Sequence, residues 1–194
     1  MSSFIERCAP GARQPQFGTW VKLPSLETVE ILARCGYDFI VVDGEHSPLT
    51  LESVYRTIAL GQALGLQVLV RVADRSGESV QRVLDAGADG ILTPQVASAQ
   101  VAAEVTQRMV FTRDGGARGM GATSRAGAWG LASTDEYLER GRTQLARIVQ
   151  LESAQALQHV EEILDVPTVN AALIGLGDLT LETGLKPTDP AIRD

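Results

Sequence analysis

Cysteine, histidine, lysine and aromatic residues are all scarce in this chain of 194 residues. The two cysteines, Cys8 and Cys35, cannot build a disulfide framework, so we expect a reducing compartment and a cytoplasmic protein. The segment Met1 to Pro10 lacks the apolar core of a signal peptide, and no apolar run reaches membrane-spanning length. The net charge of −7, with no basic stripe to offset it, argues against a nucleic-acid partner.

Short apolar runs alternate with segments of helical spacing along the whole chain. We expect strands at 17–23, 39–43, 67–71, 90–94, 146–151 and 171–175. We expect helices at 26–35, 50–64, 79–86, 98–110, 134–144 and 153–164. The segment 111–129 is rich in Gly and Arg and has no periodicity, which is typical of a functional or mobile loop. This alternation predicts a parallel sheet with helical crossovers.

Two parallel α/β architectures fit this alternation, a doubly wound sheet and a (β/α)8 TIM barrel. No Gly-x-Gly-x-x-Gly follows the first run, which weakens the doubly wound, dinucleotide-binding alternative. Polar residues follow four of the runs, as they do at the mouth of a barrel. We therefore predict a single TIM-barrel domain over 1–194. Since such barrels take roughly 250 residues, only about six βα units are expected here and the last two are missing.

His46 stands directly after the most apolar run, in the sequence Asp43-Gly44-Glu45-His46. The carboxyl ends of strands are where chemistry sits in βα proteins. An imidazole there can act as a general acid or base, because it titrates near neutral pH. The alternative is a hydrogen-bonded structural histidine.

Three other polar side chains follow predicted strands. Arg71 can hold a carboxylate by two hydrogen bonds, or it can form a salt bridge to Asp43 or Asp85. Glu152 and Asp178 follow neighbouring strands and together offer hard oxygen ligands to Mg²⁺ or Mn²⁺. The alternative is that each carboxylate caps the helix after its strand.

Six short motifs resemble those of one known family, in the same order, from about Gly18 to the end of the chain. They are Gly44-Glu45-His46, Leu69-Val70-Arg71-Val72, Leu84-Asp85-Ala86-Gly87-Ala88, Gly115-Gly116-Ala117-Arg118-Gly119, Val149-Gln150-Leu151-Glu152 and Ile174-Gly175-Leu176-Gly177-Asp178-Leu179. Together they resemble the metal-dependent (class II) pyruvate aldolases of the citrate-lyase-like superfamily. That family includes 4-hydroxy-2-oxoheptanedioate and 2-keto-3-deoxy-sugar-acid aldolases. Each motif alone is weak, but six in register are specific.

The resemblance implies a lyase that reversibly splits a 4-hydroxy-2-oxo acid into pyruvate and an aldehyde, in aromatic-acid or sugar-acid breakdown. It implies that His46 is the acid/base, that Asp85 raises its basicity, and that Arg71 holds the pyruvate carboxylate or enolate. It also implies a homo-oligomer, usually a hexamer.

The resemblance further implies a cofactor, a divalent Mg²⁺, Mn²⁺ or Co²⁺ ion bound by Glu152 and Asp178. Gln150 and the Gly177 backbone would line the substrate site beside Asp178. The family pattern usually has Pro-Ala or a similar pair before the second metal aspartate, whereas this chain has Leu176-Gly177.

Two alternatives stay open. A Schiff-base (class I) aldolase needs a buried lysine, and the chain has only Lys22, at the end of the first predicted strand, and Lys186, in a Pro-flanked tail. A truncated barrel could also be non-catalytic.

Overall fold

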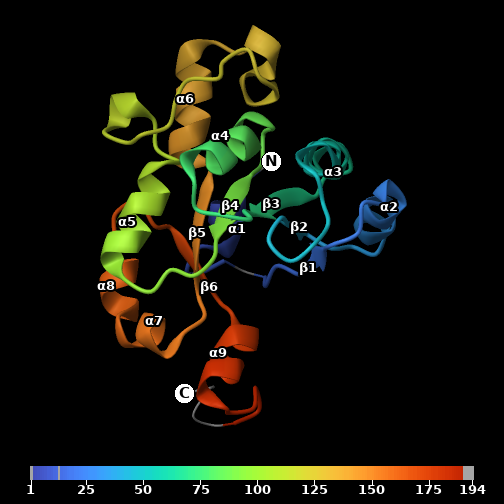
Figure 1. Ribbon diagram of the computed structural model, residues 1–194. Coiled ribbons are helices and arrows are strands. Elements are labelled where there is room, and N and C mark those ends of the chain that lie inside the picture. The colour runs from blue at the N-terminus through green and yellow to red at the C-terminus, as the bar shows by residue number, and fades with distance from the viewer. Residues whose placement is uncertain (1, 13, 190–194) are drawn as a thin grey trace.

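Six parallel strands form one sheet in the computed structural model, which describes residues 2–12 and 14–189 (Figure 1). The strands are β1 (Gly18–Val21), β2 (Phe39–Asp43), β3 (Gln67–Arg71), β4 (Gly90–Thr93), β5 (Ala146–Leu151) and β6 (Ala171–Ile174). Each strand pairs in parallel with the next along the chain. A doubly wound sheet reverses its strand order at a switch point, so this sequential order excludes it. The sheet is a curled half-barrel.

The helices of the described residues lie mostly on the outer face of this sheet. They are α1 (Phe4–Cys8), α2 (Leu26–Arg34), α3 (Leu51–Ala63), α4 (Gly77–Asp85), α5 (Ala99–Gln107), α6 (Thr134–Thr143), α7 (Ala154–Gln158), α8 (Val160–Leu164) and α9 (Leu176–Thr183). In Figure 1, α2 and α3 lie beside β1 to β3, and α5, α7 and α8 lie on the side of β5 and β6. No helix within the described ranges is long and apolar enough to cross a membrane.

The predicted bounds of helices and strands agree best with the structure where the apolar runs and the capping residues are clear. The bounds of β2, β3 and β5 agree with the predicted ranges, and Ser25 and Thr50 cap α2 and α3 by accepting backbone N–H bonds. The predicted helix 153–164 is wrong as a single helix: its backbone turns at His159 (φ −108°, ψ 18°), which separates α7 from α8. The helices α1 and α9 were not expected.

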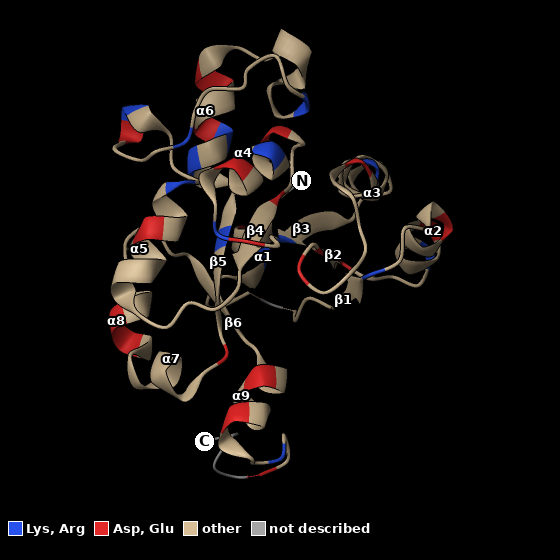
Figure 2. Cartoon of the chain, in the orientation of Figure 1, with Lys and Arg blue, Asp and Glu red and all other residues tan. Residues whose placement is uncertain are grey.

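Apolar side chains pack on both faces of the sheet, which is why its strands carry unbroken apolar runs. On the outer face Ile40 and Val68 pack beneath the helices, whereas Val41 and Leu69 point to the inner face. Phe4 of α1 belongs to the inner cluster, so α1 covers the interior of the half-barrel. Figure 2 shows the charged residues mostly on helices and loops, with few on the strands. The few charged residues at strand ends are therefore candidates for a functional site.

Candidate active site

Asp43 and Arg71 end neighbouring strands at the same height. The β2–β3 register pairs the two residues directly, so their side chains leave the sheet on the same face. Arg71 Nε donates to Asp43 Oδ1 at 2.9 Å and Arg71 Nη2 donates to Asp43 Oδ2 at 2.7 Å. Both side chains are buried. The salt-bridge alternative for Arg71 is therefore present, and its partner is Asp43 rather than Asp85.

Asp43 also organises the loop that carries His46. Its Oδ1 accepts the backbone N–H groups of Glu45 and His46 at 3.1 Å each, and Lys22 Nζ lies 3.0 Å from its Oδ2. Burial by itself raises the pKa of Asp43. The hydrogen bonds from Arg71, the His46 backbone and Lys22 outweigh it and hold that pKa far below its usual range. Asp43 is therefore an anion that holds two cationic side chains, those of Arg71 and Lys22, and one loop.

Arg71 keeps donors free for a ligand despite this pairing. A guanidinium carries five N–H donors. Two go to Asp43, and Nη1 also lies 3.2 Å from Glu45 Oε2. The group stacks on the ring of Trp20, 4.4 Å from its centroid. Glu45 Oε2 is in turn 3.6 Å from His46 Nε2, so one carboxylate lies between the guanidinium and the imidazole.

An open cleft of about 430 Å³ lies at the carboxyl ends of the strands. It gathers residues from β1 through to α9 and thus spans the width of the sheet. Its polar lining residues are Trp20, Lys22, His46, Arg71, Gln150, Glu152 and Asp178, with the Gly177 backbone beside them. Every predicted site residue except Asp85 lines this cleft.

Glu152 is the buried carboxylate of the cleft. Its Oε1 accepts the backbone N–H of Gln95 at 2.6 Å, and its Oε2 accepts a hydrogen bond from the Gln150 amide. Burial raises the pKa of Glu152, these two hydrogen bonds lower it, and the nearby Asp178 carboxylate raises it again; the net shift is upward. Two carboxylates this close favour either a shared proton or a bound cation.

The donor set fits a divalent cation with oxygen ligands. Among the residues that the structure describes, no group of three or more His, Cys, Asp or Glu side chains is arranged to hold a metal. However, Gln150 Oε1 is a buried oxygen without a hydrogen-bond partner next to Glu152. Mg²⁺ and Mn²⁺ commonly take one or two carboxylates and complete their shell with other oxygens and water.

The helix-capping alternative fails for one of the two carboxylates. Ser153, not Glu152, caps α7 by accepting the Ala156 N–H. Asp178 lies in the first turn of α9, where the helix dipole favours an anion, so its position serves the helix as well as the cleft.

The structure does not bring Asp85 to His46. Asp85 ends α4, and a helix that follows a parallel strand runs back to the amino end of the sheet. There its Oδ1 accepts a hydrogen bond from Gln81 at 2.9 Å. His46 is at the opposite, carboxyl end of the strands. Any contact between the two would have to join two copies of the chain.

Trp20 and Gln95 are site residues that the sequence analysis missed. Trp20 is an alternating residue of a short strand, and nothing in its sequence context marks it as a wall of the cleft. Gln95 has a left-handed backbone (φ 58°), which aims its N–H at Glu152. Pro94, directly after β4, is only a weak signal, because a proline marks the end of a strand but not the backbone of the residue that follows.

Comparison with known proteins places the chain in one family. The family profile described as HpcH/HpaI aldolase/citrate lyase matches residues 16–191. The chain is 34% identical, over 182 residues, to the 2-keto-3-deoxy-L-rhamnonate aldolase of Escherichia coli (strain K12), and the match covers 93% of this chain and 66% of that protein. The chain thus spans just under two thirds of that relative's length.

Two solved structures agree with this assignment. An HpcH/HpaI aldolase/citrate lyase family protein from Burkholderia cenocepacia J2315 superposes with a TM-score of 0.89 at 31% identity, over 100% of this chain and 77% of that one. An HpcH/HpaI aldolase from Desulfitobacterium hafniense DCB-2 gives 0.89 at 26% identity, over 100% and 74%. This chain belongs to the HpcH/HpaI aldolase/citrate lyase family, and the resemblance in its motifs is confirmed.

Proposed function

We propose that this chain carries the enolate-forming site of a class II aldolase, a lyase that splits a 4-hydroxy-2-oxo acid into pyruvate and an aldehyde. The observation that carries the proposal is the meeting of Arg71, His46 and two carboxylates in one cleft. The same cleft offers a guanidinium for a carboxylate, an imidazole for a proton and oxygen ligands for a cation. An acidic protein thereby gains the local positive charge that an anionic substrate needs.

Each residue has a defined task in this proposal. The free N–H groups of Arg71 bind the substrate carboxylate, and Trp20 fixes the plane of that guanidinium. His46 is 58% exposed and faces the cleft, so it can reach a substrate hydroxyl. It accepts the 4-hydroxyl proton as the C3–C4 bond breaks, and it returns a proton to C3 of the enolate once the aldehyde has left.

Glu152 and Asp178 would hold a divalent ion, with Gln150 and the Gly177 backbone beside them. When bound, Mg²⁺, Mn²⁺ or Co²⁺ would stabilise the negative charge that develops on the keto oxygen. Gln95 and Gln150 hold Glu152 in place for that purpose. The similarity to a 2-keto-3-deoxy-L-rhamnonate aldolase favours a 2-keto-3-deoxy sugar acid as the substrate class.

Proton exchange at the pyruvate methyl group tests the proposal without knowledge of the aldehyde. In D₂O, NMR should show exchange that EDTA abolishes and that added Mg²⁺ or Mn²⁺ restores. His46→Asn should slow exchange roughly 100-fold, the usual worth of a general base. His159→Asn is the matched control and should exchange normally, because His159 lies between α7 and α8 outside the cleft. Equal rates for the two variants would contradict the proposed role of His46.

The class I alternative has one observation in its favour, since Lys22 also lines the cleft. Its ammonium is paired with Asp43, and imine formation would require that this pair breaks. Borohydride reduction in the presence of pyruvate separates the two mechanisms. A covalent adduct on Lys22, formed despite EDTA, would favour class I, whereas metal-dependent exchange without an adduct favours class II.

We also propose that the half-barrel is part of a (β/α)8 barrel that acts as a homo-oligomer. The sequential strand order supports the first point, since each strand of such a barrel neighbours the next. The position of Asp85 bears on the second. If Asp85 orients His46, it does so across an interface between copies, and Asp85→Asn would alter the pH profile of an oligomer only.

A further inference from the structure

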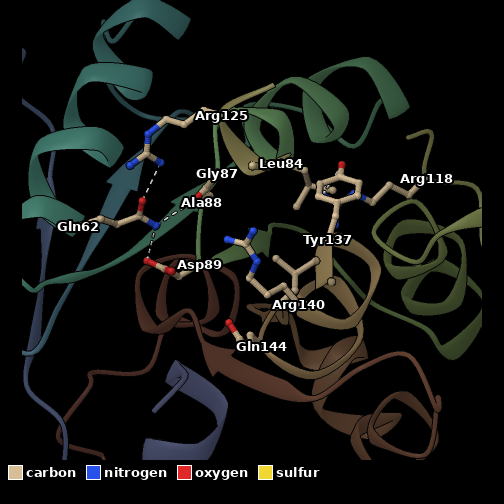
Figure 3. A pocket seen from close by; sticks show the side chains of 13 residues that line it. Gln62, Leu84, Gly87, Ala88, Asp89, Arg118, Arg125, Tyr137, Arg140 and Gln144 are labelled. Atoms are coloured by element: carbon tan, nitrogen blue, oxygen red, sulfur yellow. Dashed lines mark hydrogen bonds between the residues drawn. The ribbon is translucent and has the colours of Figure 1, made fainter. Parts of the chain in front are cut away.

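A second cavity lies at the amino end of the strands, opposite the catalytic cleft. Its volume is about 280 Å³, and it is bounded by the ends of α3 and α4, by α6 and by the loop 111–130 (Figure 3). Three guanidinium groups line it, those of Arg118, Arg125 and Arg140, against the single carboxylate of Asp89. A net positive cavity is unexpected in a chain of net charge −7.

None of the three arginines has a carboxylate within 4 Å among residues 2–12 and 14–189. Arg125 Nη1 donates instead to the Gln62 amide oxygen at 2.7 Å and to the Ala86 carbonyl at 3.1 Å. Figure 3 shows Arg140 projecting between Asp89 and Tyr137. Asp89 is engaged elsewhere, because it accepts hydrogen bonds from Gln62 and from the Val68 backbone.

Arg118 is the strongest sign of a ligand site. It is only 4% exposed, yet its Nε has no hydrogen-bond partner. Its Nη2 reaches the Tyr137 hydroxyl at 3.3 Å, and its guanidinium lies 4.3 Å from the Phe111 ring centroid. Burial lowers the pKa of Arg118, and Tyr137 and the Asp85 carboxylate, which is not in contact with it, offset only part of that shift. A buried guanidinium without a carboxylate in contact is costly unless an anion accompanies it.

We infer that this cavity binds a small phosphate-type oxyanion, held by Arg118, Arg125 and Arg140. Planar guanidinium groups match the oxygen geometry of phosphate by paired hydrogen bonds. The volume lies just below the range of sites for larger ligands, which fits a small anion. Because Arg118 and Arg125 come from the loop 111–130 and Arg140 from α6, the anion would tie that loop to the barrel.

Phosphate titrations followed by ³¹P NMR test this inference, with Arg140→Gln as the informative variant. Arg140 is exposed on α6, so the variant should fold, and it should weaken phosphate binding about tenfold or more. The matched control is Arg142→Gln, two residues along the same helix, whose guanidinium is paired with Asp114 outside the cavity. Asp89→Asn should tighten binding, since it removes the one negative charge of the lining.

A second arm separates this site from the catalytic cleft. Saturating pyruvate should leave phosphate binding unchanged, whereas displacement of phosphate by pyruvate would put the anion at Arg71 and overturn the inference. Equal weakening in Arg140→Gln and Arg142→Gln, or no binding by the unaltered chain, would overturn it too. Glycerol 3-phosphate replaces phosphate in a parallel titration. Tighter binding of this monoester identifies a phosphorylated metabolite as the ligand, and equal binding identifies free phosphate.

Discussion

Arg71 contacts two kinds of partner, the carboxylates of Asp43 and Glu45 and the aromatic face of Trp20. A lysine at this position would keep the charge but lose both the fork that grips Asp43 and the planar surface that stacks on Trp20. Because the Asp43–Arg71 pair is buried, an Asp43 oxygen that loses its donor cannot accept a hydrogen bond from water instead.

We therefore expect Arg71→Lys to reduce the free energy of unfolding by about 2 kcal/mol, in the range of a buried charged hydrogen bond. The control is Arg142→Lys, which loses an equally bidentate pair with Asp114, but at the surface. That change should cost much less, because both groups are exposed and water replaces the lost hydrogen bond. Urea unfolding of the two variants measures the difference, and equal losses would show that burial does not govern the Arg71 pair.

Asp89 should make the free energy of unfolding fall as pH rises, which is the opposite of the usual effect of an aspartate. Burial raises its pKa, although hydrogen bonds from Gln62 and the Val68 backbone oppose the shift. The native chain thus binds a proton more tightly than the unfolded chain does. The free energy of unfolding should therefore fall as pH rises from the usual aspartate range through the raised pKa.

In Asp89→Asn this decline should become smaller, because an amide oxygen can still accept both hydrogen bonds without acquiring a charge. The part that is left belongs to Glu152, whose pKa is also raised. Urea unfolding between pH 4 and pH 8 checks it. Asp114 is a contrasting case, because the hydrogen bond from Arg142 lowers its pKa. Its contribution to the free energy of unfolding is therefore lost as pH falls, and Asp114→Asn should remove that loss. A decline as steep in Asp89→Asn as in the unaltered chain would contradict the role given to Asp89.

At the scale of the elements, the junction of β6 and α9 needs a glycine at position 175, because the backbone there lies close to Glu152 and Gln150. A Cβ on Gly175 would come within 2.6 Å of Glu152 Cβ and 2.9 Å of the Gln150 amide nitrogen. At Gly177, two residues later, a Cβ would meet nothing within 4 Å. These two glycines therefore form a matched pair around the carboxylate site.

We expect Gly175→Ala to displace Glu152 and to weaken Mn²⁺ binding about tenfold or more, as changes to the supports of metal ligands usually do. Gly177→Ala should bind Mn²⁺ as the unaltered chain does. Calorimetric titration with Mn²⁺ gives both constants. Unchanged affinity in Gly175→Ala would mean that Glu152 is not a ligand.

The sequence predicts the elements well where apolar runs and caps coincide, and less well where the decisive contact is distant. The strand that ends at Asp43 and the strand that ends at Arg71 were both located by their β-branched residues. The break at His159 has no Gly or Pro to mark it. Asp85 stands at a helix end, as the predicted helix 79–86 implies, but the sequence does not reveal that this helix end lies far from His46 within one chain.

At the scale of the whole molecule, the protection of backbone N–H groups against hydrogen exchange should differ from strand to strand. The strand β4 is buried along its whole length, whereas β6 alternates partly buried and exposed residues. In hydrogen exchange, β2 to β4 should therefore exchange most slowly, and the two edge strands, β1 and β6, most rapidly. Mass spectrometry of peptic fragments measures the order. Uniform protection across all six strands would indicate that both edges are covered in solution.

Trp20 and Asp178 line one cleft, although they come from opposite edges of the sheet. In the proposed function, a pyruvate molecule and a cation would therefore bridge the first and the last strand. By mass action, a ligand at about 100 times its dissociation constant adds about 2.7 kcal/mol to the stability of the folded chain. Much of that stabilisation would fall on the edge strands β1 and β6, so the bound substrate would limit how far these two strands can move apart.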